Sequence, residues 1–199
     1  MVETVSSNQV PEHLRSNRSS LSQWLGKTIL NSLGWKVSGS IPNEERILIV
    51  AAPHTSNWDF VIGMGALLGL NAKIKWIGKH TLFKPGIKWF FSWLGGIPVN
   101  RNNPASFIED VTNMIKRDNG LMIGVAPEGT RKKITRWKTG FLRIAKLTQS
   151  KILFIAIDEP SKTIRIANSL FIPTEDREND LTLVKNYFKK FKGINPEQS

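Results

Sequence analysis

A continuous apolar run that ends at a proline restricts the fold of this chain more than any other feature. The segment from Arg46 to Ala52 is apolar after its first residue, and Pro53 follows it directly. An apolar run without alternating polar residues is typical of a strand buried on both faces, as in a parallel sheet covered by helices. His54 is therefore predicted to lie just past the carboxyl end of a buried strand.

Strand-like and helical segments alternate along the rest of the chain. The further strand-like runs are Ile74–Gly78, Ile97–Asn100, Leu121–Ala126, Ile152–Ile157 and Thr163–Ala167. Between them, Phe107, Val111 and Ile115 recur at four-residue spacing after the helix-start signal Asn103-Pro104. Further helices are predicted at 139–148 and 181–191. This order predicts an α/β fold with a mixed, mostly parallel sheet flanked by helices, and an active site past the carboxyl ends of the strands.

The length of 199 residues fits one domain. The first 18 residues are polar, include Pro11 and lack the basic start and apolar stretch of a signal peptide. We expect a mobile N-terminal segment over 1–18 and a single domain over 19–199. The longest apolar run, Phe60 to Leu70, is about half of the roughly 20 residues that a spanning helix needs, so no spanning helix is expected.

Positive charge is in strong excess. The chain contains 28 Lys and Arg against 16 Asp and Glu, a formal net charge of +12, which favours anionic partners such as phosphates, nucleic acid or acidic lipid headgroups. Because the aromatic residues are not interleaved with the basic runs as stacking platforms, no nucleic acid partner is expected. The chain has no cysteine, which excludes thiolate chemistry. It has only three histidines, and this small number argues against a metal site.

Two segments combine tryptophan with lysine. In Leu21–Val37 the apolar residues recur at helical spacing, which predicts an N-terminal amphipathic helical segment. In Leu82–Leu94 a short helix is predicted beside Lys84 and Lys88, and it is crowded by Trp89, Phe90, Phe91 and Trp93. Both compositions suit the headgroup region of a membrane. The alternative is that both segments pack into the core or over its edge.

His54 and Asp59 are the leading catalytic candidates. On one continuous helix, residues five apart would be separated by roughly 140° and could not meet. If His54 stays on the loop and Ser56 caps a helix, Asp59 falls in the first turn and reaches back to His54. The carboxylate would then orient the imidazole and leave its other nitrogen to take a proton from an attacking hydroxyl. When that hydroxyl attacks a carbonyl, the carbonyl oxygen becomes an oxyanion, and backbone amides near His54 are expected to stabilise it.

The same residues also allow a purely structural interpretation. Ser56-Asn57-Trp58-Asp59 fits the capping-box pattern, in which the fourth residue bonds back to the first. In that case Asp59 only starts a helix.

A second group of candidates follows the strand-like run Leu121–Ala126. It consists of Glu128, Gly129, Thr130 and Arg131. Gly129 would let the backbone approach a ligand, Arg131 offers a fork suited to phosphate, and Glu128 could accept a hydroxyl proton or hold a basic neighbour. The alternative is a solvated turn with a surface ion pair. Arg101 similarly follows a short strand, and its alternative is an ordinary exposed arginine.

With these motifs in order, the sequence resembles the glycerophospholipid acyltransferases, typified by lysophosphatidic acid acyltransferase. His54-x4-Asp59 is similar to the first motif of that family, Gly96 to Arg101 to the second, and Pro127 to Arg131 to the third. The resemblance implies that His54 is the general base and Asp59 its partner. It also implies that the headgroup or glycerol phosphate of the acceptor is bound by Arg101, Glu128 and Arg131, in a pocket shaped by Gly129 and Thr130.

The activity implied is transfer of a fatty acyl group from acyl-CoA or acyl carrier protein to a free hydroxyl of a lysophospholipid. The acceptor that the resemblance implies is 1-acyl-sn-glycerol-3-phosphate, which gives phosphatidic acid. The resemblance implies no cofactor, since acyl-CoA or acyl carrier protein is the acyl-donor substrate. The expected partners are the lysophospholipid, the acyl donor and an anionic membrane surface, with the chain peripheral or monotopic at the cytoplasmic face of a membrane.

The sequence departs from the family at two points and leaves two other functions open. The fourth motif normally carries a proline, which the run from Lys151 to Ile157 lacks, and many relatives have a spanning helix. The basic residues Arg131, Lys132, Lys133, Arg136 and Lys138 would attract a phosphate-rich donor or an anionic membrane, or form a solvated loop. The alternatives are acylation of another lysolipid, such as a lyso-ornithine lipid, and a non-catalytic basic membrane-binding module.

Overall fold

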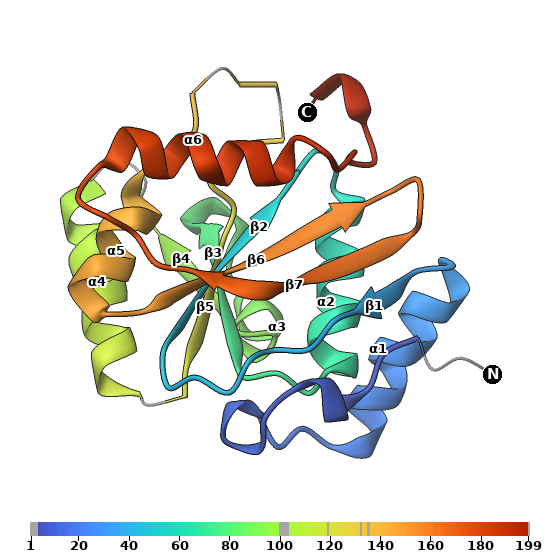
Figure 1. Cartoon of the computed structure of the whole chain (residues 1–199). Helices are drawn as coiled ribbons and strands as arrows, with labels where there is room; N and C mark the ends of the chain where they lie inside the picture. Colours follow the sequence, from blue (N-terminus) through green and yellow to red (C-terminus); the bar gives the residue numbers. More distant parts are fainter. Residues whose placement is uncertain (1–3, 100–103, 119, 132, 135, 199) are drawn as a thin grey trace.

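The protein is built on one sheet covered by helices (Figure 1). The computed structural model describes residues 4–99, 104–118, 120–131, 133–134 and 136–198. Within these residues the sheet has seven strands in the order β1-β7-β6-β2-β5-β3-β4. Their bounds are β1 (Lys36–Ser38), β2 (Ile47–Ala52), β3 (Ile74–Lys79), β4 (Gly96–Val99), β5 (Met122–Val125), β6 (Lys151–Asp158) and β7 (Thr163–Phe171). Only the pairing of β6 with β7 is antiparallel among these strands, so the predicted α/β fold with a mixed, mostly parallel sheet is confirmed.

Strand β2 lies at the centre of the sheet because its side chains are apolar on both faces. It pairs in parallel with β6 from Ile47 to Ala52 and with β5 from Leu48 to Val50. Five of its six residues are buried, as expected for a strand that packs against helices on each side. The carboxyl end of β2 leads directly into Pro53 and His54.

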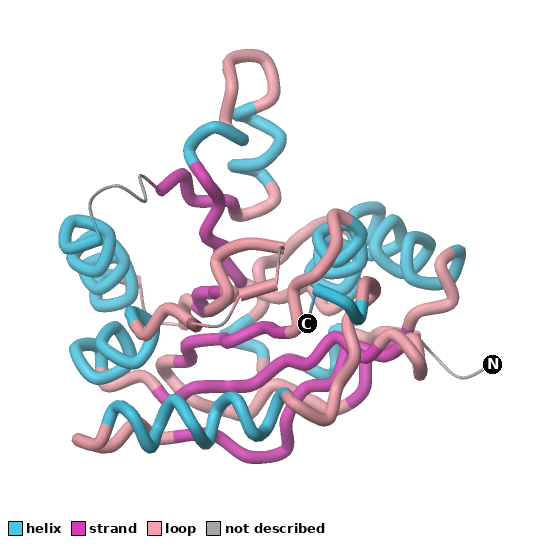
Figure 2. Tube along the Cα trace, turned by 90° about the horizontal axis from the view of Figure 1, so that it is seen from above, coloured by secondary structure: helices cyan, strands magenta, loops and turns pink. Residues whose placement is uncertain are grey.

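The helices of the described chain cover the sheet and mostly alternate with its strands along the sequence. They are α1 (Ser20–Ser32), α2 (Trp58–Gly69), α3 (Lys88–Trp93), α4 (Pro104–Arg117), α5 (Gly140–Thr148) and α6 (Arg177–Phe188). In α4, Val111 and Ile115 are each 1% exposed, and Phe107 packs on the same core, as the predicted stripe requires. Figure 2 shows that the edge strand β4 and its neighbour β3, together with α3, extend away from the rest of the molecule. None of the helices in the described ranges is both long and apolar enough to cross a bilayer.

Helices α1 and α2 touch backbone to backbone. A Cβ atom on Gly26 of α1 would lie 2.3 Å from the backbone nitrogen of Gly69 and 2.6 Å from the carbonyl oxygen of Gly65. Only glycine permits this approach. The amphipathic helix predicted near the N-terminus therefore supports α2, the helix that carries Asp59.

The sequence predicts a mobile segment at the start of the N-terminal region, followed by an amphipathic helical segment. Within the segment expected to be mobile, residues 4–18 pack on the core, since Val5, Val10 and Leu14 are at most 1% exposed. These apolar residues are spaced among polar ones, so no contiguous apolar stretch marks them in the sequence. The predicted N-terminal amphipathic helical segment is confirmed as α1, which ends at Ser32, and Val37 belongs to β1, paired with β7.

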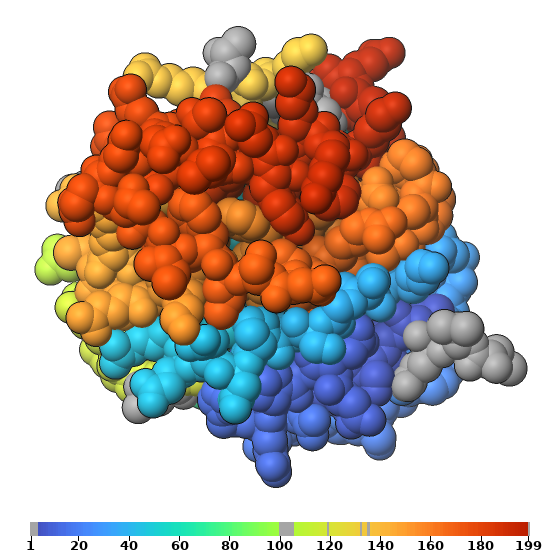
Figure 3. Space-filling model, viewed as in Figure 1, coloured from blue at the N-terminus to red at the C-terminus, as the bar shows by residue number. Residues whose placement is uncertain are grey.

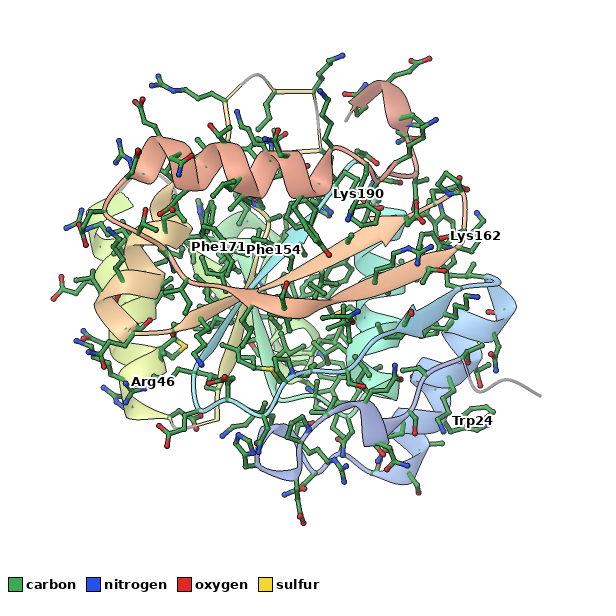
Figure 4. All side chains as sticks on the ribbon, in the orientation of Figure 1. Trp24, Arg46, Phe154, Lys162, Phe171 and Lys190 are labelled. Atoms are coloured by element: carbon green, nitrogen blue, oxygen red, sulfur yellow. The ribbon has the colours of Figure 1, made fainter. Side chains whose placement is uncertain are left out.

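An aromatic cluster fixes α6 on the sheet. Phe154 of β6 stacks on Phe171 of β7 with ring centroids 5.6 Å apart, and Tyr187 and Phe188 of α6 contact Phe154 at 4.7 and 5.4 Å. Phe154 and Phe171 lie side by side beneath α6 in Figure 4, and Figure 3 shows the helix covering this face. The chain that leaves α6 is thereby directed toward the carboxyl end of β2.

Candidate active site

The sheet brings two sequence-predicted loops together. His54 follows β2 and Glu128 follows β5, and these strands are parallel neighbours. The backbone amide of His54 donates a hydrogen bond to Oε2 of Glu128 at 2.7 Å. The loops 53–57 and 127–131 therefore form one site at the carboxyl ends of the strands, where α/β sheets bind ligands.

His54 and Asp59 meet as the catalytic interpretation requires. His54 precedes α2, and Asp59 lies in the first turn of that helix. The Nδ1 atom of His54 is 3.2 Å from Oδ2 of Asp59, and the side chain of His54 is 29% exposed whereas that of Asp59 is fully buried. A buried carboxylate on Nδ1 orients the ring and leaves Nε2 to exchange a proton with a substrate.

Asp59 also performs the structural role that was considered as the alternative. Its Oδ2 atom accepts hydrogen bonds from the backbone amides of Thr55, at 2.7 Å, and Ser56, at 2.6 Å. The hydroxyl of Ser56 accepts from the amide of Trp58 at 3.2 Å. The helix starts one residue later than predicted, with Asn57 at the N-cap position. The two interpretations are compatible, because one carboxylate oxygen holds both the loop and the imidazole.

The amides of this loop do not serve as predicted for the oxyanion. Those of Thr55 and Ser56 donate to Asp59, and that of His54 donates to Glu128. A backbone N–H that is bound to a carboxylate is not available to a developing oxyanion. The prediction that amides near His54 stabilise the oxyanion is therefore wrong for these three.

Burial raises the pKa of Glu128 to about 7. The hydrogen bond from the amide of His54 and the proximity of the His54 side chain lower this pKa, and the Asp59 carboxylate raises it. Burial outweighs the favourable contacts because a carboxylate loses much of its hydration in this position.

Arg131 contacts the loop 53–57, and Gly129 shapes the turn of the loop 127–131. A guanidinium N–H of Arg131 donates to Oδ1 of Asn57. Gly129 has a φ of +67°, a conformation that favours glycine, and the side chain of Lys138 lies on its open face, 3.1 Å from where a Cβ would be. Thr130 lies between them on the same loop. Arg101, the remaining predicted binding residue, is outside the described residues.

Sequence reasoning missed the contacts made by residues 193–195. The backbone amide and the side-chain Nδ2 of Asn195 donate to Oγ1 and to the carbonyl oxygen of Thr55, each at 3.1 Å. Nothing in the local sequence marks these residues, because they lie 140 positions from Thr55. Within the described chain no three His, Cys, Asp or Glu side chains are grouped so that they could hold a metal ion.

Comparisons with known proteins identify the family. A family model described as Acyltransferase matches residues 35–158, which include β2, the His54 loop and the Glu128 loop. The chain belongs to this acyltransferase family, and the resemblance seen in its motifs is confirmed.

Two individual relatives are informative. The 1-acyl-sn-glycerol-3-phosphate acyltransferase of Streptococcus pneumoniae (strain ATCC BAA-255 / R6) is 29% identical over 136 residues, 63% of this chain and 50% of that protein. The present chain thus spans about half the length of this curated relative. The crystal structure of the 1-acyl-sn-glycerophosphate (LPA) acyltransferase, PlsC, from Thermotoga maritima matches with a TM-score of 0.61 and 24% identity, over 85% of this chain and 78% of that one. This likeness shows a shared fold.

The raised pKa of Glu128 predicts a specific pH dependence of stability. A carboxyl that binds its proton more tightly when folded stabilises the protein fully below its unfolded pKa, and this contribution is lost as pH rises through about 7. Glu128→Gln keeps an oxygen for the His54 amide and cannot titrate. The stability of the variant relative to wild type should therefore rise between pH 5 and pH 8, by up to about 3 kcal/mol.

Urea unfolding at both pH values measures this difference. The matched control is Glu109→Gln at an exposed position of α4, which should follow the wild-type pH trend. A constant difference between Glu128→Gln and wild type would contradict the assignment.

Proposed function

We propose that the protein transfers a fatty acyl group from a thioester, acyl-CoA or acyl carrier protein, to a free hydroxyl of a lysophospholipid. The observation that carries the proposal is the His54–Asp59 pair, 3.2 Å apart at the carboxyl end of β2. We take 1-acyl-sn-glycerol-3-phosphate as the acceptor, because the relative from Streptococcus pneumoniae is named for that substrate. The product is then phosphatidic acid.

The chemical step follows from the orientation of His54. Nε2 of His54 accepts the proton of the acceptor hydroxyl as its oxygen bonds to the thioester carbonyl carbon. The tetrahedral intermediate collapses, the carbon–sulfur bond breaks, and the thiolate takes the proton from His54. Asp59 stabilises the imidazolium between these two transfers. No covalent acyl-enzyme is needed, because the attacking hydroxyl belongs to the substrate.

Replacing His54 tests the base directly. His54→Ala should lower kcat by about 10²- to 10⁴-fold, the usual contribution of a positioned general base. The assay is mass spectrometry of products after incubation with lysophosphatidic acid and either thioester donor. A panel of other lysolipids, including a lyso-ornithine lipid, identifies the acceptor.

The control for this variant is His13→Ala. His13 is exposed on the 3₁₀ turn Glu12–Leu14 and contacts the carbonyl oxygen of Glu44, far along the chain from the site. It should retain wild-type turnover. If His54→Ala also retained wild-type turnover, the proposed mechanism would be refuted, and a wild-type protein that binds lipid but acylates no acceptor would be a membrane-binding module.

The second loop supplies cationic contacts for an acceptor phosphate in this proposal. Arg131 is exposed beside Asn57, and a guanidinium has five N–H groups, so the contact with Asn57 leaves donors for phosphate oxygens. Arg101, Gly129 and Thr130 keep the binding roles implied by the family motifs. Glu128 also keeps the role in acceptor binding that the family motif implies, and its carboxylate accepts from the amide of His54.

Arg131→Ala should discriminate between acceptors. We expect KM for lysophosphatidic acid to rise at least about tenfold, because a charge-assisted hydrogen bond contributes about 1.5–3 kcal/mol. KM for the uncharged acceptor 1-monoacylglycerol should change less than about threefold. Arg143→Ala, at an exposed position of α5, is the matched control. Equal losses with both acceptors would count against a phosphate contact.

We further propose that exposed aromatic residues dock the protein on an anionic membrane. Trp89 is 70% exposed and Trp93 47% exposed on α3, and Trp24 of α1 is 60% exposed, lying on the outer side of that helix in Figure 4. Another residue of α3, Phe91, packs against Phe60 of α2, with ring centroids 5.9 Å apart. Phe60 adjoins Asp59, so this surface connects directly to the helix that carries the dyad.

Vesicle sedimentation tests the docking surface. The double variant Trp89→Ala/Trp93→Ala should bind phosphatidylglycerol vesicles at least about tenfold more weakly, since two large aromatic side chains no longer enter the headgroup region. The control is Ile172→Ala/Leu183→Ala, which removes two other exposed apolar side chains and should bind as wild type does. Equal binding by the two double variants would contradict a role for α3.

A further inference from the structure

We infer that Asn195 is a positioning residue for the reaction, and that residues 192–198 hold the His54 loop in its active geometry. This inference rests on the proposed role of His54. Asn195 touches neither His54 nor Asp59 in the contacts described above and acts through Thr55, which lies between them in the chain.

Thr55 is held from two directions. Its backbone amide donates to Oδ2 of Asp59 at 2.7 Å. Its Oγ1 atom accepts from the amide of Asn195, and its carbonyl oxygen accepts from Nδ2 of Asn195, each at 3.1 Å. Thr55 is only 3% exposed, so water does not readily replace these partners. The two peptide units that meet at Thr55 are thereby both held, the one shared with His54 through its N–H and the one shared with Ser56 through its carbonyl oxygen.

Gly193 makes this contact sterically possible. A Cβ atom at position 193 would lie 2.5 Å from Oγ1 and 2.8 Å from Cγ2 of Thr55. These distances are shorter than any normal contact, so a larger residue would displace either Thr55 or the segment itself. The close approach places the backbone of 193–195 directly against the His54 loop.

The segment is anchored at both of its ends. At the start, the carbonyl oxygen of Lys192 accepts from the amide of Glu159, just after β6, at 2.9 Å. At the far end, Oε1 of Gln198 accepts from the amide of Lys133 at 2.9 Å. Lys133 follows the loop that carries Glu128 and Arg131. The C-terminal segment and this loop lie side by side at the top of the molecule in Figures 1 and 3, so the segment connects both halves of the site.

The functional consequence follows from the sensitivity of proton transfer to geometry. The loop 53–57 has no regular secondary structure of its own, so its conformation depends on the groups that contact it. A displacement of about 1 Å in a catalytic group can reduce the rate up to about 10²-fold. Because Asn195 acts through Thr55 in this inference, its loss should lower kcat and leave KM unchanged.

The experiment compares Asn195→Ala with Asn195→Asp in the lysophosphatidic acid assay. Both variants should lower kcat at least about fivefold and change KM less than about twofold. Asn195→Asp retains the size and the backbone contact and replaces only the Nδ2 donor, so it removes the bond to the Thr55 carbonyl without creating a void. Asn186→Ala, at an exposed position of α6, is the matched control and should behave as wild type.

A double-mutant comparison separates positioning from a general structural effect. In a His54→Ala background, Asn195→Ala should cause no further loss of the residual rate, because there is no base left to position. An additional fivefold loss in that background, or a wild-type kcat for both Asn195 variants, would overturn the inference. These outcomes differ from failure of the proposed mechanism itself, in which His54→Ala alone would retain wild-type turnover.

Discussion

The parallel packing of β2 between β5 and β6 is the constraint on which the site depends. Because β2 is buried on both faces, it must occupy the centre of the sheet. Its carboxyl end then lies beside that of β5, and the loops that follow both strands share one edge. His54 and Glu128, 74 residues apart in the chain, meet there through a 2.7 Å hydrogen bond.

Two carboxylates organise the backbone around the proposed base. Glu128 holds the amide of His54, and Asp59 holds the next two amides together with the imidazole. Each amide that is bound in this way has one orientation, which reduces the reorganisation needed when a proton moves. The raised pKa of Glu128 is the electrostatic cost of placing a second carboxyl in this partly dehydrated position.

The same arrangement links the site to two distant parts of the chain. Phe60, beside Asp59, packs against Phe91 and Trp76, so a lipid surface bound at the exposed tryptophans of α3 would be linked to α2 through these ring contacts. Thr55 is covered by Asn195 on its other side. Proposed membrane docking and proposed positioning of the base therefore act on neighbouring residues of one loop and one helix.

The sequence alone determined the alternation of strands and helices, the strand that precedes His54, and the three motifs, because burial on both faces and helical periodicity leave a local record in residue order. It did not reveal the packing of Val5, Val10 and Leu14, the strand β1, or the contacts of Gly193 and Asn195 with Thr55. These depend on partners that are distant in the chain, and a single polar residue carries no mark of the backbone that it will meet. Only the tertiary structure decided that Asp59 serves both the helix start and His54, since that requires distances that no spacing can supply.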